Sequence, residues 1–174
     1  MKEYKYPTEQ EWGEIIIRPH LDTSKLNETV AGVLSEIRHE GDAAVRKYEQ
    51  MFDHVVLDSL QVTKEEIDAA VASVDSELLD ALKLAHANIH KFHSSQHISP
   101  KRVTTAPGVE CWQKCVAIEK VGLYIPGGTA PLFSTVLMLA TPARIAGCGE
   151  IVLCTPPDRE GHINPAILAA AHVA

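Results

Sequence analysis

Residues 121–157 constrain the fold more than any other part of the chain. They read VGLYIPGGTAPLFSTVLMLATPARIAGCGEIVLCTPP, which begins with the alternating apolar residues of a strand and continues through a Pro-Gly-Gly turn. An apolar segment of helical length then ends at Gly147, and a second short strand is expected over 150–153. The stretch predicts a strand–helix–strand unit of an α/β fold. The chain ends at Ala174 inside the expected next helix, so we expect a half-built sheet with an unpaired edge and an uncovered face.

The chain before this unit is predicted to be mainly helical, with a domain boundary near residue 120. Helices are expected over 28–39 and from Asp42 onward, and Thr63 with Glu66 forms the capping box of a third. Asp75 can cap a long helix that reaches about His97. The side chains expected to face inward are Val30, Val33, Leu34 and Ile37 in the first helix, Val45, Tyr48 and Phe52 in the second, and Leu78, Leu82, Ala85, Ile89 and Phe92 in the long one.

The residue pattern between the long helix and the α/β unit is typical of extended chain. Residues 98–108 contain two prolines and a glycine and are interpreted as a connector. Residues 109–125 suggest two strands with a break near Lys120 and Val121. The overall prediction is a helical N-terminal region, 1–120, followed by the start of an α/β domain, 121–174.

The Pro-Gly-Gly turn is the first candidate ligand site. Pro126 ends the strand, and Gly127 and Gly128 can adopt positive φ and let a ligand approach the backbone closely. The helix that follows would direct its positive end at the turn, where phosphate or another anion binds well, and Ser134 or Thr135 could supply a capping hydroxyl. No GxGxxG or GKS/T motif is present, and many such turns bind nothing, so both interpretations stay open.

A ladder of histidines is the second candidate site. His86, His90, His93 and His97 recur at helical spacing on the long helix, and two HxxxH pairs on one face could chelate zinc or a similar metal. No Glu lies inside either pair, which excludes the HExxH protease motif. The alternative is a solvated or interdomain helix face that is rich in histidine.

No set of catalytic side chains can be assembled from the sequence. Ser134 lacks the GxSxG context of a nucleophile elbow, and Cys111 and Cys115 lack the basic neighbours that activate a thiolate. The four cysteines form neither a CxxC pair nor a zinc-finger pattern. We therefore assign no catalytic and no metal-binding residue.

Charge and hydropathy narrow the class of protein. The chain has 16 Lys and Arg against 23 Asp and Glu, a net charge of −7, which argues against nucleic acid or an anionic membrane as a partner. A phosphate ligand stays open because a backbone cradle needs no net positive charge. The N-terminus has no apolar signal-peptide core, and the longest apolar run, within 132–140, is too short to span a bilayer. We expect a cytoplasmic protein with reduced cysteines.

The stretch EKVGLYIPGGTAPLFSTVLMLATPARIAGCGEIVLCTPP resembles the histidinol dehydrogenase family. The segments GDAAVRKYEQMFD and NIHKFHSSQ also look like that family and lie in register with it. The resemblance extends from about residue 28 to the end of the chain.

The resemblance implies a function and a fold. Members of the family oxidise L-histidinol to L-histidine at the end of histidine biosynthesis, using two NAD in succession and an aldehyde held on the enzyme. They are zinc-dependent homodimers of the cytoplasm with incomplete Rossmann-like domains, so residues 121–174 would be the start of such a cofactor domain. In the family the tyrosine of the VGLYIPGG motif contacts NAD, which here implies Tyr124, and we extend the cofactor site to Gly127 and Gly128.

The departure from the family is its length. Family members are more than twice as long, and their zinc ligands, their proton-moving Glu-His pair and most substrate contacts lie beyond the part that this chain resembles. We therefore expect the chain alone to be inactive and to associate with itself or with a missing C-terminal half. The alternative is a non-catalytic binding or assembly module that retains the N-terminal fold.

Overall fold

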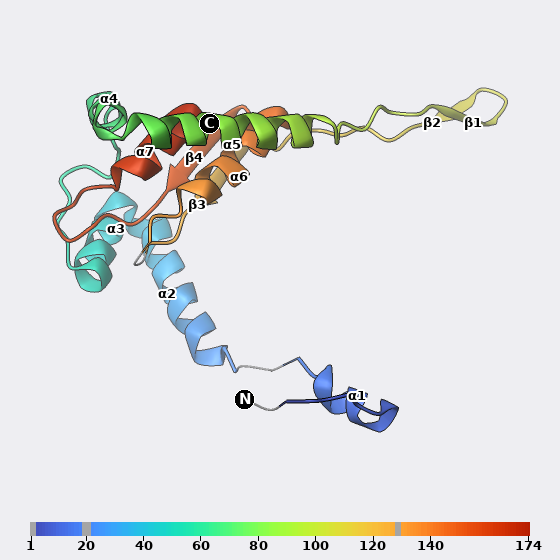
Figure 1. The fold of residues 1–174 in the computed structure, drawn as a ribbon, viewed down its shortest axis with the longest axis horizontal. Coiled ribbons are helices and arrows are strands. Elements are labelled where there is room, and N and C mark those ends of the chain that lie inside the picture. Colours follow the sequence, from blue (N-terminus) through green and yellow to red (C-terminus); the bar gives the residue numbers. More distant parts are fainter. Residues whose placement is uncertain (1–2, 19–21, 128–129) are drawn as a thin grey trace. The chain divides into compact units, whose positions relative to one another are not determined.

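The computed structural model describes residues 3–18, 22–127 and 130–174. It divides into two compact units, 1–44 and 45–174; the domain boundary near residue 120 stays a prediction. The elements follow one another along the chain in this order (Figure 1): α1 (Glu9–Ile15), α2 (Ser24–Glu40), α3 (Asp42–Tyr48), the π-helical turn η1 (Glu49–Asp53), α4 (Lys64–Ser73), α5 (Ser76–Ser94), β1 (Val103–Ala106), β2 (Val109–Cys111), β3 (Lys120–Tyr124), α6 (Phe133–Ile145), β4 (Glu150–Cys154) and α7 (Pro165–Val173). None of the helices in the described parts of the chain is long and apolar enough to cross a membrane.

The N-terminal helices confirm two predictions and contradict two others. Helix α2 covers the expected 28–39, and it ends where Gly41, at φ 60°, donates its N–H to the Ile37 carbonyl at 2.8 Å. Of the expected inward stripe of α2, Val33 and Ile37 are half-buried, whereas Val30 and Leu34 are exposed, Leu34 at 59%. In η1, Phe52 stacks on Tyr48 at a ring-centroid distance of 5.5 Å but is 56% exposed, so its predicted inward position is wrong.

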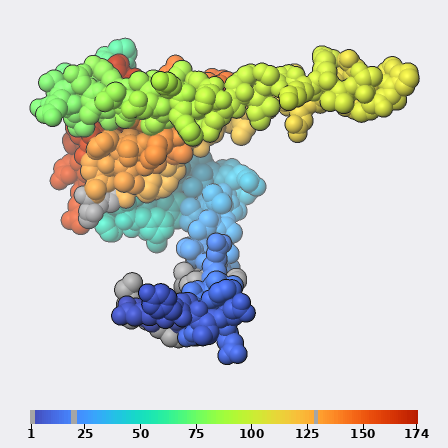
Figure 2. Space-filling view, turned by 45° about the vertical axis from the view of Figure 1, so that its right-hand side comes forward, coloured from blue at the N-terminus to red at the C-terminus, as the bar shows by residue number. Residues whose placement is uncertain are grey.

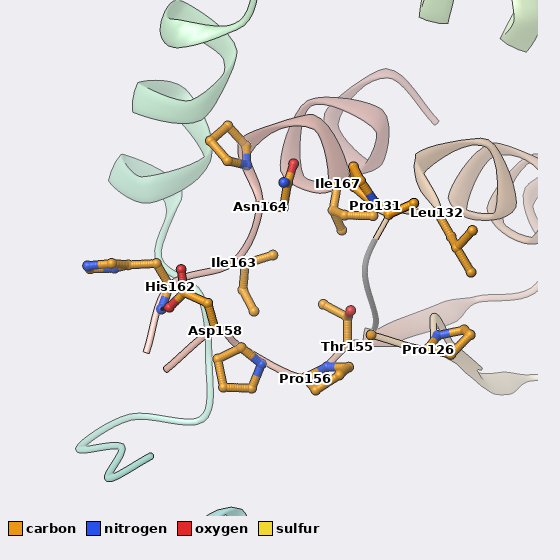
Figure 3. A pocket seen from close by; sticks show the side chains of 14 residues that line it. Pro126, Pro131, Leu132, Thr155, Pro156, Asp158, His162, Ile163, Asn164 and Ile167 are labelled. Atoms are coloured by element: carbon orange, nitrogen blue, oxygen red, sulfur yellow. Dashed lines mark hydrogen bonds between the residues drawn. The ribbon is translucent and has the colours of Figure 1, made fainter. Parts of the chain in front are cut away.

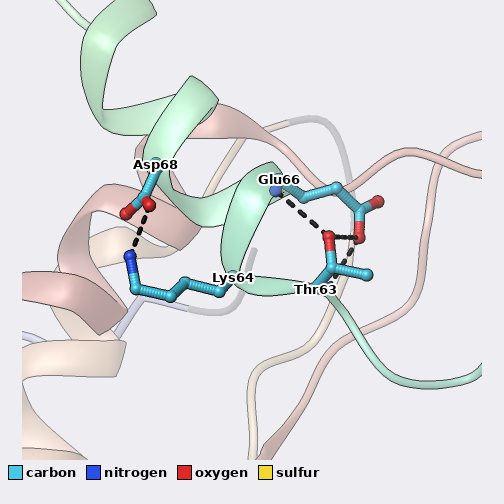
Figure 4. Close-up of polar contacts among 4 residues, drawn as sticks. All are labelled: Thr63, Lys64, Glu66 and Asp68. Atoms are coloured by element: carbon cyan, nitrogen blue, oxygen red, sulfur yellow. Dashed lines mark hydrogen bonds and ion pairs between the residues drawn. The ribbon is translucent and has the colours of Figure 1, made fainter.

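Two predicted helix caps are present. The Glu66 N–H donates to the Thr63 hydroxyl at 3.2 Å, and the Glu66 carboxylate accepts from the Thr63 N–H at 2.7 Å (Figure 4). At the start of α5 the Asp75 carboxylate accepts from the Glu77 N–H at 2.7 Å. These bonds satisfy N–H groups that a helix start otherwise leaves without partners.

The end of α5 and the segment after it differ from the prediction. The helix stops at Ser94, so His97 lies outside it, and Phe92 is 61% exposed instead of buried. Part of the expected connector is strand β1, which pairs antiparallel with β2 through a turn in which Gly108 has φ 81°. All residues of both strands are exposed.

The strand–helix–strand unit is confirmed. β3 and β4 pair in parallel, from Lys120 opposite Glu150 to Tyr124 opposite Cys154, and α6 connects them. Gly147, at φ 84°, closes α6 as expected for a residue that follows the helix end. Of the described strands, β3 and β4 pair only with each other.

The core of the second unit lies on one face of this strand pair, against α5, α6 and α7. Alternate strand residues such as Leu123 and Leu153 pack against it. Its most buried side chains are Leu82, Ile125, Val136, Leu137, Ile167, Ala169 and Ala170. The opposite face, which we call the uncovered sheet face, consists of the exposed residues Gly122, Tyr124, Val152 and Cys154.

Candidate functional site

A cavity lies at the carboxyl ends of β3 and β4 (Figure 3). It has a volume of about 520 Å³ and is lined by residues 126–127 and 130–132 after β3, and by 155–158, 162–165 and Ile167 after β4. Open α/β sheets bind their ligands outside the carboxyl ends of the strands because the connecting loops diverge there. The cavity is therefore the natural place for a small ligand in this unit.

Gly127 lines this cavity and packs tightly against its other wall. A Cβ atom at Gly127 would lie 2.6 Å from Cγ of Pro156, far inside contact distance. The backbone at Gly127 is not in the left-handed region. The structure thus gives Gly127 a packing reason to be glycine, beside the ligand approach that the sequence suggested. Gly128 lies outside the described residues.

Tyr124 is close to the cavity in sequence but belongs to the uncovered sheet face. Its side chain is 63% exposed, and its register partner is Cys154 on the neighbouring strand. The described residues that line the cavity include Gly127 but not Tyr124. A ligand that touches both residues would have to extend from the cavity over the end of β3.

The two helices that start beside the cavity differ in their N-termini. At α7, Asn164 accepts the N–H groups of Ala166 through Oδ1 at 2.9 Å and of Ile167 through its carbonyl at 2.9 Å, and Pro165 has no N–H. At α6 the N-cap residue is Leu132, which has no side-chain oxygen.

The expected capping hydroxyls are also not at the N-cap of α6. Ser134 and Thr135 lie one and two residues inside the helix, so their predicted role as the cap is wrong. Of these two helix starts, α6 is the one that can offer backbone N–H groups to an anion.

The loop after β4 brings two titratable side chains to the cavity that sequence reasoning missed. Asp158 Oδ1 accepts the N–H groups of Glu160 at 3.0 Å and His162 at 2.8 Å, and Gly161 has φ 86°. Asp158 and His162 both line the cavity (Figure 3). One signal in the sequence could have indicated them. Both residues follow the second strand of the unit, so their loop lies at the same carboxyl edge of the strand pair as the Pro-Gly-Gly turn.

The histidine ladder is shorter than predicted. His86 and His90 have ring centroids 6.0 Å apart, whereas His93 Nδ1 contacts Gln96 Oε1 at 2.8 Å and His97 is beyond the helix. Among the described residues, no three His, Cys, Asp or Glu side chains gather as a metal site. Cys111, Cys115, Cys148 and Cys154 are free thiols.

The capping boxes of α1 and α4 each lower the pKa of a carboxyl, that of Glu11 and that of Glu66, and neither residue lines the cavity. Hydrogen bonds from the Thr63 backbone and hydroxyl lower the pKa of Glu66 below its usual value. This is the expected effect of donors on a carboxylate, and it belongs to the capping box of α4 and not to the cavity.

Comparison with known proteins identifies a single family over most of the chain. The family model described as histidinol dehydrogenase matches residues 16–174. A histidinol dehydrogenase of Bacteroides thetaiotaomicron is 59% identical over 174 residues, which are 100% of this chain and 41% of that protein. One of Salmonella typhimurium is 50% identical over 144 residues, 82% of this chain and 33% of that protein.

A solved structure is also similar. The crystal structure of histidinol dehydrogenase from Elizabethkingia anophelis matches with a TM-score of 0.90 and 47% sequence identity, over 96% of this chain and 39% of that chain. The chain thus spans about two fifths of the length of the proteins it matches.

Proposed function

The chain belongs to the histidinol dehydrogenase family, and we propose that it forms the NAD-facing wall of a cytoplasmic enzyme that oxidises L-histidinol to L-histidine, the last step of histidine biosynthesis. In this proposal β3, α6 and β4 are the first part of an incomplete Rossmann-like cofactor domain. One observation carries it. Tyr124, in the segment on which the family resemblance rests, ends β3 with its ring 63% exposed at the carboxyl edge of the strand pair.

The residues at this edge fit NAD chemically. The exposed ring of Tyr124 offers a flat apolar surface and a hydroxyl, which suit an aromatic ring or a ribose of the cofactor. The start of α6 has no side-chain cap and suits a negatively charged phosphate group. Gly127 lines the adjacent cavity, and we keep Gly128 in the proposed cofactor site on the resemblance alone. Bound NAD would supply the hydride acceptor of the oxidation.

The described residues do not fit the zinc of the family. No three His, Cys, Asp or Glu side chains gather among them, and the described lining of the cavity holds only two titratable side chains, Asp158 and His162. Asp158 already accepts two N–H groups through Oδ1 and thereby holds its own loop together. We therefore propose that the zinc ligands and the proton-moving groups belong to the part of the enzyme that this chain does not span.

The uncovered sheet face supports the proposal that further polypeptide completes the site. Tyr124 and Val152 leave 63% and 50% of their surface exposed on that face, and the described strands leave both edges of the pair unpaired. Exposed apolar surface and open strand edges are ordinarily covered in a stable enzyme. We propose that the rest of the enzyme, or a second copy in a homodimer, covers this face and these edges.

A non-catalytic binding or assembly module is the second candidate. It is favoured by the cavity itself, whose described lining offers only Asp158 and His162 as titratable side chains. The coding sequence directly downstream distinguishes the two. Segments carrying zinc ligands and a Glu-His pair, in frame or in a neighbouring gene, support the enzyme; unrelated sequence supports the module.

Growth of bacteria that lack histidinol dehydrogenase tests the proposed function. The chain is expressed alone or together with the part of the Bacteroides thetaiotaomicron relative that the match leaves out. We expect growth without histidine only when both parts are present. Growth with this chain alone, or failure of the two folded parts together, would contradict the proposal.

Variants at the end of β3 then test the cofactor site. In the complemented system Tyr124→Ala should weaken NAD affinity, while Tyr124→Phe separates the ring from the hydroxyl. Cys154→Ala, opposite Tyr124 on the neighbouring strand, is the matched control and should leave the affinity unchanged. Unchanged NAD affinity in Tyr124→Ala would remove this residue from the site.

A further inference from the structure

We propose that His86 and His90 on α5 form a two-histidine site for a divalent transition metal such as Ni²⁺, Cu²⁺ or Zn²⁺. The two residues lie one helical turn apart, and their ring centroids are 6.0 Å apart with the rings tilted by 56°. Residues four apart project from the same face of a helix, so both imidazoles can reach one ion. Neither residue belongs to the cavity or to the proposed NAD wall.

Helix α5 is a rigid support for the pair. It is continuous from Ser76 to Ser94, is capped by Asp75, and is fixed to the core through Leu82, Ala85 and Ile89. Its other side forms a long surface stretch, shown in green in Figure 2. A site on a fixed helix needs only side-chain rotation to bind, because the backbone spacing is already set.

The rings need a small movement to share an ion. Imidazole nitrogens bind zinc at about 2.0–2.1 Å, which requires the rings to approach somewhat more closely than the observed 6.0 Å between centroids. His90 is exposed and His86 is half-buried, so His90 has the freedom to make most of this movement.

The surroundings of His90 favour metal binding. Its Nδ1 lies 3.3 Å from the hydroxyl oxygen of Ser94, which leaves Nε2 for a metal, and such hydrogen bonds orient metal-binding histidines. Lys83, three residues before His86, pairs with Asp80 at 3.3 Å. The positive charge that would repel a metal ion is thus partly offset.

The other two histidines of the sequence ladder do not complete the site. His93 contacts Gln96 through Nδ1, and His97 lies past the end of the helix. Two imidazoles leave the remaining coordination positions to water or to a further ligand. Imidazole suits zinc, copper and nickel, and the affinity should be highest for Cu²⁺.

Calorimetric titration of the 174-residue chain with NiCl₂, after removal of bound metal with a chelator, tests the proposal. The unaltered chain should bind Ni²⁺, and His86→Gln or His90→Gln should each weaken the affinity at least tenfold because one of two ligands is lost. The double variant His93→Gln/His97→Gln should bind as the unaltered chain does. Circular dichroism checks that every variant retains its helices.

A rearranged variant separates spacing from histidine content. Asn88→His combined with His90→Asn keeps the number of histidines but moves the second ring to the other side of the helix, since residues two apart do not face each other. This variant should lose Ni²⁺ affinity to the same extent as His90→Gln. Equal affinity in the rearranged variant, or loss of affinity in the His93/His97 variant alone, would overturn the proposal. Neither result bears on the NAD wall, which the growth test addresses.

Discussion

The close approach of Pro156 to Gly127 leaves no room for a side chain at position 127. A Cβ at position 127 would lie 2.6 Å from Pro156 Cγ, and a proline ring in a short loop cannot move away easily. Gly127→Ala should therefore destabilise the chain by about 1–3 kcal/mol, the usual cost of forcing an extra methyl group into a packed site. Urea denaturation followed by circular dichroism measures this.

Gly122→Ala is the matched control for that substitution. Gly122 lies in β3 on the uncovered sheet face, and a Cβ there would meet nothing within 4 Å. Alanine should leave stability unchanged or raise it slightly, because it restricts the unfolded chain more than glycine does. Equal destabilisation at both positions would mean that the close approach of Pro156 is not the cause of the stability loss in Gly127→Ala.

Glu49 is a second residue whose environment predicts a measurable effect. Burial, and then the nearby Asp53, raises the pKa of Glu49, and its Oε2 is buried without a hydrogen-bond partner within the described residues. Above the raised folded pKa the charged carboxylate is disfavoured in the folded state, so Glu49→Gln should increase the free energy of unfolding at neutral pH.

The pH dependence of this gain checks its cause. As the pH falls through the folded pKa, Glu49 becomes neutral in the folded chain, and the gain of Glu49→Gln should disappear in acid. Asp53→Asn, which removes only the second cause, should give a smaller gain at neutral pH. A gain in Glu49→Gln that persists unchanged into acid would contradict this explanation.

At the residue level the sequence could name candidate positions but not their surroundings. Tyr124 and Gly127 follow from the motif, yet which face of the strand carries Tyr124 depends on the alternation that Leu123 sets by packing on the core. The close approach of Pro156 to Gly127 depends on the strand register, which brings residues about thirty positions apart together. Asp158 was missed because it belongs to no motif, and only its position after the second strand of the unit marks it as part of the cavity.

At the level of elements, helix starts were predictable because their signals are local. Thr63 and Glu66 are three residues apart, and the side chain of each accepts the backbone N–H of the other. These two hydrogen bonds need no other part of the fold. The hairpin of β1 and β2 was missed because Pro107 and Gly108 were interpreted as a connector, although they lie between two β-forming segments. The end of α5 at Ser94 was missed because the apolar spacing continues to Phe92 without a glycine or proline.

The cap of α4 gives a prediction at this level. Thr63→Ala removes the hydroxyl that accepts the Glu66 N–H, and loss of such a cap costs about 1 kcal/mol. Chemical denaturation should show this decrease, whereas Thr63→Ser should restore most of the stability. Thr104→Ala, in the exposed hairpin, is a suitable control and should change little. Equal effects at the two positions would show that the cap of α4 contributes no specific stability.

At the level of the whole molecule, the two-stranded sheet of β3 and β4 affects how the chain behaves in solution. The uncovered sheet face and the open strand edges should make the chain associate with itself. Val152→Lys, on that face, should reduce the association in sedimentation velocity at increasing concentration under reducing conditions. Val116→Lys adds the same charge at a residue that is 76% exposed outside the strands and should have little effect.

A clean monomer of the unaltered chain at high concentration would contradict the expected association. So would equal effects of the two lysine substitutions, because the association would then not depend on the sheet face.

We propose that this chain holds one wall of a redox site and that the zinc-binding and proton-moving groups lie in polypeptide that it does not span. The most direct test incubates the purified 174-residue chain with L-histidinol, NAD and added Zn²⁺ and measures NADH formation. We expect no turnover above the rate without protein. Turnover by the chain alone, with zinc retained on it through further purification, would show instead that the chain carries a complete site.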